Sequence, residues 1–208
     1  MVFKSFGQKL KKGIWSPYKV GVLYNYGNEN NFLFDDKDYS YKTNTYKAQF
    51  FYKIGSWKSL NFDLIAQPQI QFLTHKLLNP SFVQPRHGDN YLELREIYTK
   101  KKSMNLYAFE LTVTIKKQLL NKLEMQFGVG GGIAIINTKT ERLANGFTFI
   151  ENFSIGISHQ TFKNTSIYLG TNFGHVSNLN FLSPNDGYNV LGIEFGISYA
   201  LNNKKGTP

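Results

Sequence analysis

Hydrophobic and polar residues alternate along most of this chain with a period of two. In the segment NLYAFELTVTI, Tyr107, Phe109 and Leu111 occupy one parity and alternate with small or polar residues. Because successive side chains of a strand point to opposite faces, this alternation predicts β-strands with one apolar and one polar face. The pattern recurs in eight segments: 18–25, 46–53, 60–72, 105–115, 123–135, 147–158, 167–175 and 189–201.

The connections between these segments alternate between long and short. Those after the first, third, fifth and seventh segments are long, whereas those near IGSWKS, KQLLNK and HQTFKN are short. Several segments reach about 10 residues or more, whereas strands usually have about 5–6. Both features are typical of outer-membrane barrels. We therefore predict an all-β fold, an eight-stranded antiparallel transmembrane β-barrel with long external loops and short periplasmic turns.

The barrel is expected to span residues 18–201, between an N-terminal periplasmic segment (1–17) and a flexible C-terminal tail (202–208). One face of its strands is aromatic and aliphatic, as expected for contact with lipid. The other face carries charges that can pair inside a small, filled barrel. These charges are Lys19, Lys47, Lys53, Asp63, Glu110, Glu124 and Glu194. A soluble β-sandwich remains the alternative fold, although it does not explain the strand lengths or the alternation of the loops.

Composition narrows the possible chemistry. The 208 residues include no cysteine, which excludes disulfides and cysteine-based metal sites, and no pair of histidines has metal-ligand spacing. The net charge of +10 suggests an anionic partner, either nucleic acid, acidic lipid or lipopolysaccharide. The opening MVFKSFGQKLKKGIW lacks the apolar core of a signal peptide. The chain is therefore either a mature or trimmed form, or it is not exported.

Four further patterns have ordinary explanations. The run GVGGGIA is expected to place small residues inside the barrel, because alternation continues through it and no phosphate-binding turn and helix follow. The basic loops could bind nucleic acid, but a cationic rim facing lipid A phosphates fits a barrel better, and solubility explains them equally well. The stretch LELREIYTKKK could form a short helix on the outer rim. His75, His87 and His159 are expected at the surface.

The stretch 175–189, HVSNLNFLSPNDGYN, holds the candidate chemistry. His175 and Ser177 share the lipid-facing parity, at the end of a strand that leads into a long external loop. Polar side chains that face lipid cost free energy unless they serve a purpose. Hydrogen bonding to lipid headgroups is the plain alternative explanation for the pair.

This stretch resembles the lipid A 3-O-deacylases (PagL-like acyloxyacyl hydrolases), which are outer-membrane barrels with a serine-hydrolase site on their outer surface. Both His-x-Ser-Asn and Pro-Asn-Asp-Gly fall at the family's spacing. The resemblance implies that Ser177 is the nucleophile and His175 its base, and that Asn178 and Asn185 support the site or the oxyanion. It also implies that no cofactor is needed and that the protein lies in the bacterial outer membrane, with lipid A or lipopolysaccharide as its partner.

One position departs from the family. Asn189 stands where the family carries the acid of the triad as Glu, and an amide stabilises an imidazolium less than a carboxylate does. Glu194 points into the predicted barrel and cannot substitute. Glu151 is the one carboxylate on the lipid-facing parity of its segment, and a turn near Lys163 would place it across from His175. Glu151 is therefore a candidate for the acid, beside Asn189.

These observations favour an outer-membrane serine esterase that hydrolyses an ester-linked fatty acyl chain of lipid A, surrounded by outer-membrane lipids and without nucleic acid as a partner. The alternative function is a catalytically inactive small barrel that acts as a structural protein or adhesin, in which Asn189 marks lost activity. A soluble basic β-sandwich is the third possibility.

Overall fold

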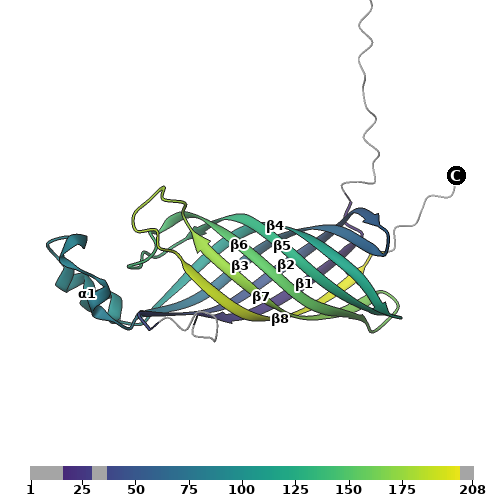
Figure 1. The fold of residues 1–208 in the computed structure, drawn as a ribbon, viewed down its shortest axis with the longest axis horizontal. Helices are drawn as coiled ribbons and strands as arrows, with labels where there is room; N and C mark the ends of the chain where they lie inside the picture. Colours follow the sequence, from purple (N-terminus) through teal and green to yellow (C-terminus); the bar gives the residue numbers. More distant parts are fainter. Residues whose placement is uncertain (1–15, 30–36, 202–208) are drawn as a thin grey trace, which may run out of the picture.

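The chain folds as a closed antiparallel β-barrel (Figure 1). The computed structural model describes residues 16–29 and 37–201, and all the following statements concern these residues. Each strand pairs with its neighbours in the sequence, and the first strand pairs with the last to close the ring. The strands are β1 (Lys19–Asn28), β2 (Tyr39–Trp57), β3 (Leu60–Leu77), β4 (Lys102–Leu120), β5 (Leu123–Ile136), β6 (Gly146–Gln160), β7 (Thr165–Ser177) and β8 (Tyr188–Ala200).

The all-β, eight-stranded prediction is confirmed. The predicted tail at 202–208 lies outside the described residues, as does the predicted periplasmic segment apart from residues 16 and 17. The apolar parity of the strands faces outward, and large side chains on it are exposed. They include Val22, Phe72, Tyr107, Phe109, Ile133, Ile155, Ile193 and Phe195. The sandwich alternative is wrong, because the apolar face is the outside of a closed ring and not a core between two sheets.

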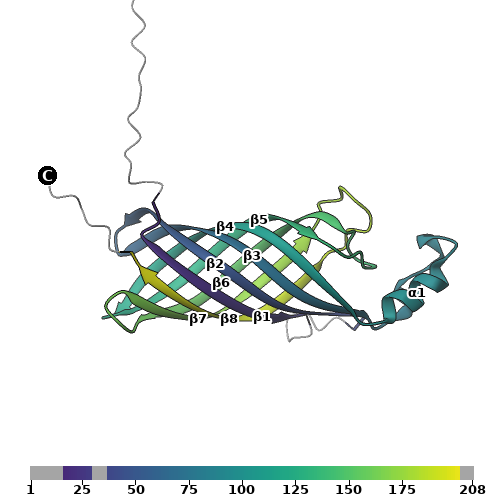
Figure 2. The same ribbon diagram turned by 180° about the vertical axis from the view of Figure 1, so that it is seen from behind.

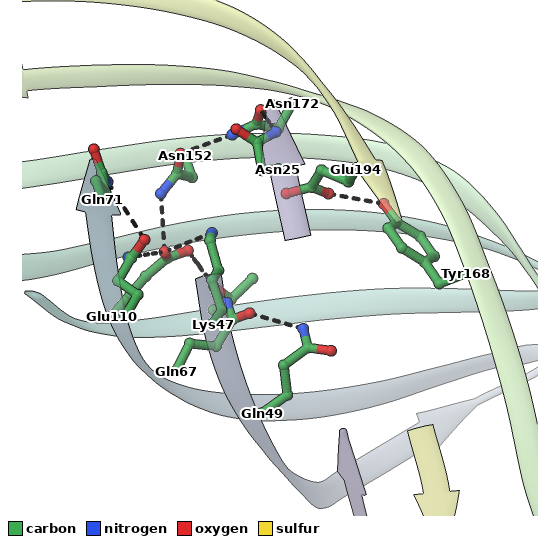
Figure 3. Close-up of polar contacts among 12 residues, drawn as sticks. Asn25, Lys47, Gln49, Gln67, Gln71, Glu110, Asn152, Tyr168, Asn172 and Glu194 are labelled. Atoms are coloured by element: carbon green, nitrogen blue, oxygen red, sulfur yellow. Dashed lines mark hydrogen bonds and ion pairs between the residues drawn. The ribbon is translucent and has the colours of Figure 1, made fainter. Parts of the chain in front are cut away.

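The interior is polar and densely hydrogen-bonded. Lys47 Nζ lies 2.9 Å from Glu110 Oε2, and both side chains are buried. The Glu110 carboxylate also accepts hydrogen bonds from Gln67, Gln69 and Asn152 (Figure 3). Of the seven charged residues predicted to point inward, five are buried: Lys19, Lys47, Asp63, Glu110 and Glu194. The other two, Lys53 and Glu124, line a cavity of about 600 Å³ at the end with the short turns.

The glycine run in β5 is explained by packing, as expected. A Cβ atom on Gly132 would overlap the carbonyl oxygen of Phe109, and one on Gly130 would overlap the side chains of Thr112 and Glu110. These inward-facing glycines of β5 therefore leave room in the lumen for the polar side chains that β4 carries at the same level.

The two ends of the barrel differ. One end carries the three short turns, and the other carries the four long connections (Figure 2). The β3–β4 connection contains the short helices η1 (Pro80–Phe82) and η2 (Pro85–His87) and the helix α1 (Tyr91–Thr99), which projects beyond the barrel wall. The helix expected in LELREIYTKKK is thus confirmed. No helix in the described ranges is long and apolar enough to cross a membrane.

Aromatic and charged side chains close the lumen at this external end. Tyr41 is stacked between His75 and Tyr188, with ring centroids 4.3 Å and 4.2 Å apart. His75 Nε2 lies 2.8 Å from Glu141, and both residues are buried. The expectation that His75 lies at the surface is therefore wrong. Its parity points inward, and the β5–β6 loop folds over the mouth to bring the carboxylate to it.

Of the other two histidines expected at the surface, His159 is exposed as predicted. The side chain of His87 is not among those described.

Candidate active site

His175 and Ser177 lie at the external end of β7, on its outward-pointing parity; His175 is half-buried, and Ser177 is buried with 8% of its surface exposed. The strand register places Glu151 of β6 opposite His175 on one side and Asn189 of β8 opposite it on the other. The predicted pairing of Glu151 with His175 across the β6–β7 hairpin is therefore confirmed at the level of the backbone. Three strands thus bring four polar residues together on a largely apolar face.

Asn189 fixes the orientation of the histidine ring. Its Oδ1 lies 2.7 Å from His175 Nδ1. Because an amide oxygen can only accept, Nδ1 carries the hydrogen and donates it. The other ring nitrogen, Nε2, is then unprotonated in the neutral imidazole, which is the state that a general base for a neighbouring hydroxyl requires. The amide thus orients the ring as the acid of a triad would, without its negative charge.

Glu151 lies on the other side of the ring and is exposed on the outer face. In the part of the chain that the structure describes, no ion pair or hydrogen bond joins Glu151 to His175. Cβ atoms of directly opposed residues in an antiparallel pair lie about 4.5–5.5 Å apart, so the two side chains start from neighbouring positions on the outer face. On its far side Glu151 pairs with Gly131 of β5, where the absence of a side chain leaves open space.

Gly187 covers the His175–Ser177 pair. Its φ is +64°, a conformation that L side chains rarely adopt. A Cβ atom here would lie 3.3 Å from both His175 Cε1 and Ser177 Cβ, and would overlap the carbonyl oxygen of Val176. The backbone of Gly187 therefore lies directly against both candidate residues, and the glycine is required at this position.

The two other asparagines of the motif hold the β7–β8 loop. The backbone N–H of Asn178 donates to Asn185 Oδ1 (2.5 Å), and Asn178 Nδ2 donates to the carbonyl oxygen of Leu182 (2.8 Å). Asn185 Nδ2 in turn lies 3.2 Å from Asn180 Oδ1. Both residues thus give the loop its shape next to Ser177, whose own carbonyl accepts from Thr148 Oγ1 (2.6 Å).

Arg142, in the β5–β6 loop, is a contributor that sequence reasoning missed. Its Nε donates to the carbonyl oxygen of Gly187 (2.8 Å) and its Nη2 to that of Asp186 (3.4 Å), while the N–H of Gly187 donates to the carbonyl oxygen of Arg142 (3.1 Å). The guanidinium also lies 4.1 Å from the centroid of the Tyr39 ring. Arg142 therefore clamps the segment that covers His175 and Ser177. In the sequence it is one cation in a basic loop, and nothing marks it as different.

Aromatic side chains border the site on the β6 side. Phe149 lies opposite Ser177 in the strand register. Its ring centroid is 5.0 Å from that of Phe147 and 6.0 Å from that of Phe181 in the β7–β8 loop. Aromatic residues are enriched where a membrane meets water, so these rings are consistent with a site at the level of the lipid headgroups.

No cluster of three or more His, Asp or Glu side chains that could hold a metal ion occurs within residues 16–29 and 37–201. The described site offers a hydroxyl, an imidazole, amides and one carboxylate. This set matches the requirements of a serine hydrolase, in which a base activates a hydroxyl and a third group orients the base.

The chain is similar to a known protein family and to solved barrel structures. The model of a family described as lipid A 3-O-deacylase (PagL) matches residues 79–198, more than half of the chain. The crystal structure of the outer membrane enzyme PagL is similar at a TM-score of 0.59 and 13% identity, covering 85% of this chain and 97% of that one. The crystal structure of Neisserial surface protein A is similar at 0.51 and 10%, covering 88% and 96%. A search of curated proteins finds no match.

Proposed function

This chain belongs to the lipid A 3-O-deacylase (PagL) family of outer-membrane β-barrels, and we propose that it is a serine esterase that releases an ester-linked fatty acyl chain from lipid A. The observation that carries the proposal is the hydrogen bond of Asn189 to His175 Nδ1. It leaves Nε2 of the ring free to act as a base, and His175 Cε1 and Ser177 Cβ both lie against Gly187 at the external end of the barrel.

The proposed reaction has two halves. The Ser177 hydroxyl attacks the ester carbonyl while His175 Nε2 takes its proton, and the proton is then given to the sugar oxygen as the carbon–oxygen bond breaks. A water molecule next attacks the acyl-serine, with His175 again taking and returning the proton. The products are the free fatty acid and the sugar hydroxyl, and the reaction needs no cofactor.

The third position of the triad is proposed to be shared by two residues. Asn189 orients the imidazole through its hydrogen bond, and Glu151, on the neighbouring strand, supplies the negative charge that stabilises the imidazolium. In this arrangement Glu151 replaces the charge of the family's acid without taking its place on Nδ1. The second NH of the Asn185 amide, together with backbone N–H groups, is proposed to stabilise the oxyanion.

The inactive-barrel alternative is not favoured. Asn189 forms the hydrogen bond that a triad acid would form, so its presence does not remove the orientation of the base. Gly187 and Arg142 also hold the loop against His175 and Ser177, a degree of order that a passive surface does not require.

Mass spectrometry of lipid A from cells with and without the protein tests the proposal. Cells that make the unaltered protein should contain lipid A lacking one acyl chain, whereas cells that make Ser177→Ala should not. Thr171→Ala is a matched control, because Thr171 lies on the same outward face of β7 and is exposed. Deacylation by Ser177→Ala, or none by the unaltered protein, would contradict the proposed reaction.

A further inference from the structure

A cavity of about 240 Å³ lies at the external end of the barrel, bordered by three connections. The β3–β4 connection contributes Arg86 and Tyr98, the β5–β6 loop contributes Lys139 and Glu141, and the β7–β8 loop contributes Pro184. The β7–β8 loop links the cavity to the candidate active site.

The link is short. The carbonyl oxygen of Pro184 lies 3.4 Å from Asn178 Nδ2, and Asn178 directly follows Ser177. One hydrogen bond therefore separates the wall of the cavity from the residue next to the nucleophile.

Arg86 and Lys139 are exposed cations on the wall of this cavity. Within the described ranges neither of them forms an ion pair. The carboxylate in the same wall, Glu141, lies 2.8 Å from His75 Nε2. Its other oxygen, Oε1, is buried and has no hydrogen-bond partner in the part of the chain that the structure describes. Two exposed cations and the Glu141 residue thus line the same cavity.

We propose that this cavity binds the phosphate-bearing saccharide headgroup of the lipid substrate, with Arg86 and Lys139 contacting phosphate oxygens. This inference rests on the proposed function. The apolar wall contributed by Phe82 and Tyr98 suits the face of a sugar ring. Phosphate, with several acceptor oxygens and a negative charge, is the ligand that arginine and lysine bind best together.

The position of the cavity agrees with the orientation of such a substrate. Ser177 is the last residue of β7, and the strand reaches the external end there. An acyl chain whose ester lies at Ser177 extends along the lipid-facing strands, so the headgroup must lie on the external side of Ser177. The cavity is formed by the external connections and lies on that side.

Arg142, although closer to the site, does not take this role. Its guanidinium donates to two carbonyl oxygens of the β7–β8 loop and stacks on Tyr39. Its function is to hold the loop, whereas the side chains of Arg86 and Lys139 are exposed and available to a ligand.

The test compares Arg86→Gln, Lys139→Gln and the double variant on two forms of the same lipid, lipid A with its phosphates and lipid A after enzymatic dephosphorylation. The double variant should raise KM for the phosphorylated form about tenfold, which corresponds to about 1.4 kcal/mol, and leave KM for the dephosphorylated form unchanged. Lys163→Gln is the matched control, an exposed lysine in the turn at the opposite end of the barrel. An equal rise for both lipids, or no rise, would overturn the assignment.

A binding measurement separates this inference from the proposed function. The Ser177→Ala protein in detergent is titrated calorimetrically with each form of the lipid, with and without the two glutamine substitutions. Preference for the phosphorylated lipid that disappears with the substitutions supports the cavity even if no hydrolysis is seen; the absence of preference overturns it. Inorganic phosphate is added as a competitor, and displacement of the lipid only at a large excess distinguishes a headgroup site from a site for free phosphate.

Discussion

At the scale of single residues, the proposed mechanism divides the role of the triad acid between Asn189 and Glu151. In a serine protease triad, changing the aspartate to asparagine lowers kcat about 10⁴-fold. This chain carries the amide naturally, and the hydrogen bond to His175 Nδ1 is retained at 2.7 Å. In the proposed mechanism, orientation and charge are carried by two side chains, Asn189 on β8 and Glu151 on β6.

Asn189→Asp is expected to raise kcat. The two side chains have the same shape, so the hydrogen bond to His175 is kept and a negative charge is added to the imidazolium. Because Glu151 already provides part of this charge, we expect an increase of about tenfold, well below the about 10⁴-fold range of the protease. Steady-state hydrolysis of lipid A in detergent micelles measures this change in kcat. An unchanged or lower kcat would show that charge at this position does not limit the reaction.

Glu151→Gln is expected to lower kcat by about a hundredfold, within the range that one acid–base partner contributes, with little change in KM. The substitution keeps the size of the side chain and removes only its charge. Asp186→Asn is the control, because Asp186 is an exposed carboxylate in the neighbouring loop. Equal kcat values for Glu151→Gln and Asp186→Asn would remove Glu151 from the reaction and leave Asn189 as the only orienting group.

The sequence predicts the positions of these residues only within regular strands, where alternate side chains point to the same face. His175, Ser177 and Glu151 lie on regular strands. The alternation of side chains, together with the position of one turn, therefore predicts that Glu151 lies opposite His175. His75 has the inward parity of β3, and the β5–β6 loop that folds over the mouth and brings Glu141 to it cannot be predicted from the strand pattern.

At the scale of elements, the β5–β6 loop supports the β7–β8 loop. Thr140 Oγ1 lies 2.9 Å from the hydroxyl of Tyr41 and accepts from the N–H groups of Arg142 (3.2 Å) and Leu143 (3.0 Å). Arg142 then reaches the carbonyl oxygen of Gly187. One loop is thereby anchored in the lumen and holds the other against the outer face. Alternation of side chains does not extend into loops, which is why the sequence does not reveal this support.

Arg142→Gln is expected to lower kcat by about a hundredfold, because misplacing a reacting group by about 1 Å has an effect of this size. Arg142→Lys should lower kcat to a similar extent, since an ammonium lacks the planar fork that reaches two carbonyl oxygens while stacking on Tyr39. The rate of Ser177 labelling by a fluorophosphonate should fall in parallel, while the mobility of the folded barrel on gels stays the same. Normal labelling in both variants would contradict a positioning role.

At the scale of the whole molecule, the lumen is a filled polar core that stabilises the barrel, as the strand pattern predicts. Lys47 and Glu110 lie at its centre, with Gln67, Gln69 and Asn152 around the carboxylate (Figure 3). Composition and parity predict that these charges point inward. They do not predict which charges pair, because the pairing depends on the register of strands that are distant in the sequence.

Lys47→Met is expected to lower the free energy of unfolding by about 3 kcal/mol, because removing one partner of a buried ion pair leaves the other charge uncompensated. Lys53→Met is the matched control. Lys53 has the same parity on the same strand but is exposed at the open end of the lumen, so its loss should have little effect. Urea unfolding in detergent, followed by the shift in gel mobility between folded and unfolded barrel, measures the difference. Equal stability of the two variants would show that the central pair is not a stabilising contact.

The orientation of the barrel decides which leaflet meets Ser177. The long connections and the site share one end, and outer-membrane barrels place long loops outside the cell. The chain contains no cysteine, so a single introduced thiol reports its own position. Arg86→Cys should react with a membrane-impermeant maleimide on intact cells, whereas Ser59→Cys, in the short β2–β3 turn, should react only after lysis. The reverse labelling would place His175 and Ser177 at the inner leaflet, away from lipid A, and the proposed substrate would then be wrong.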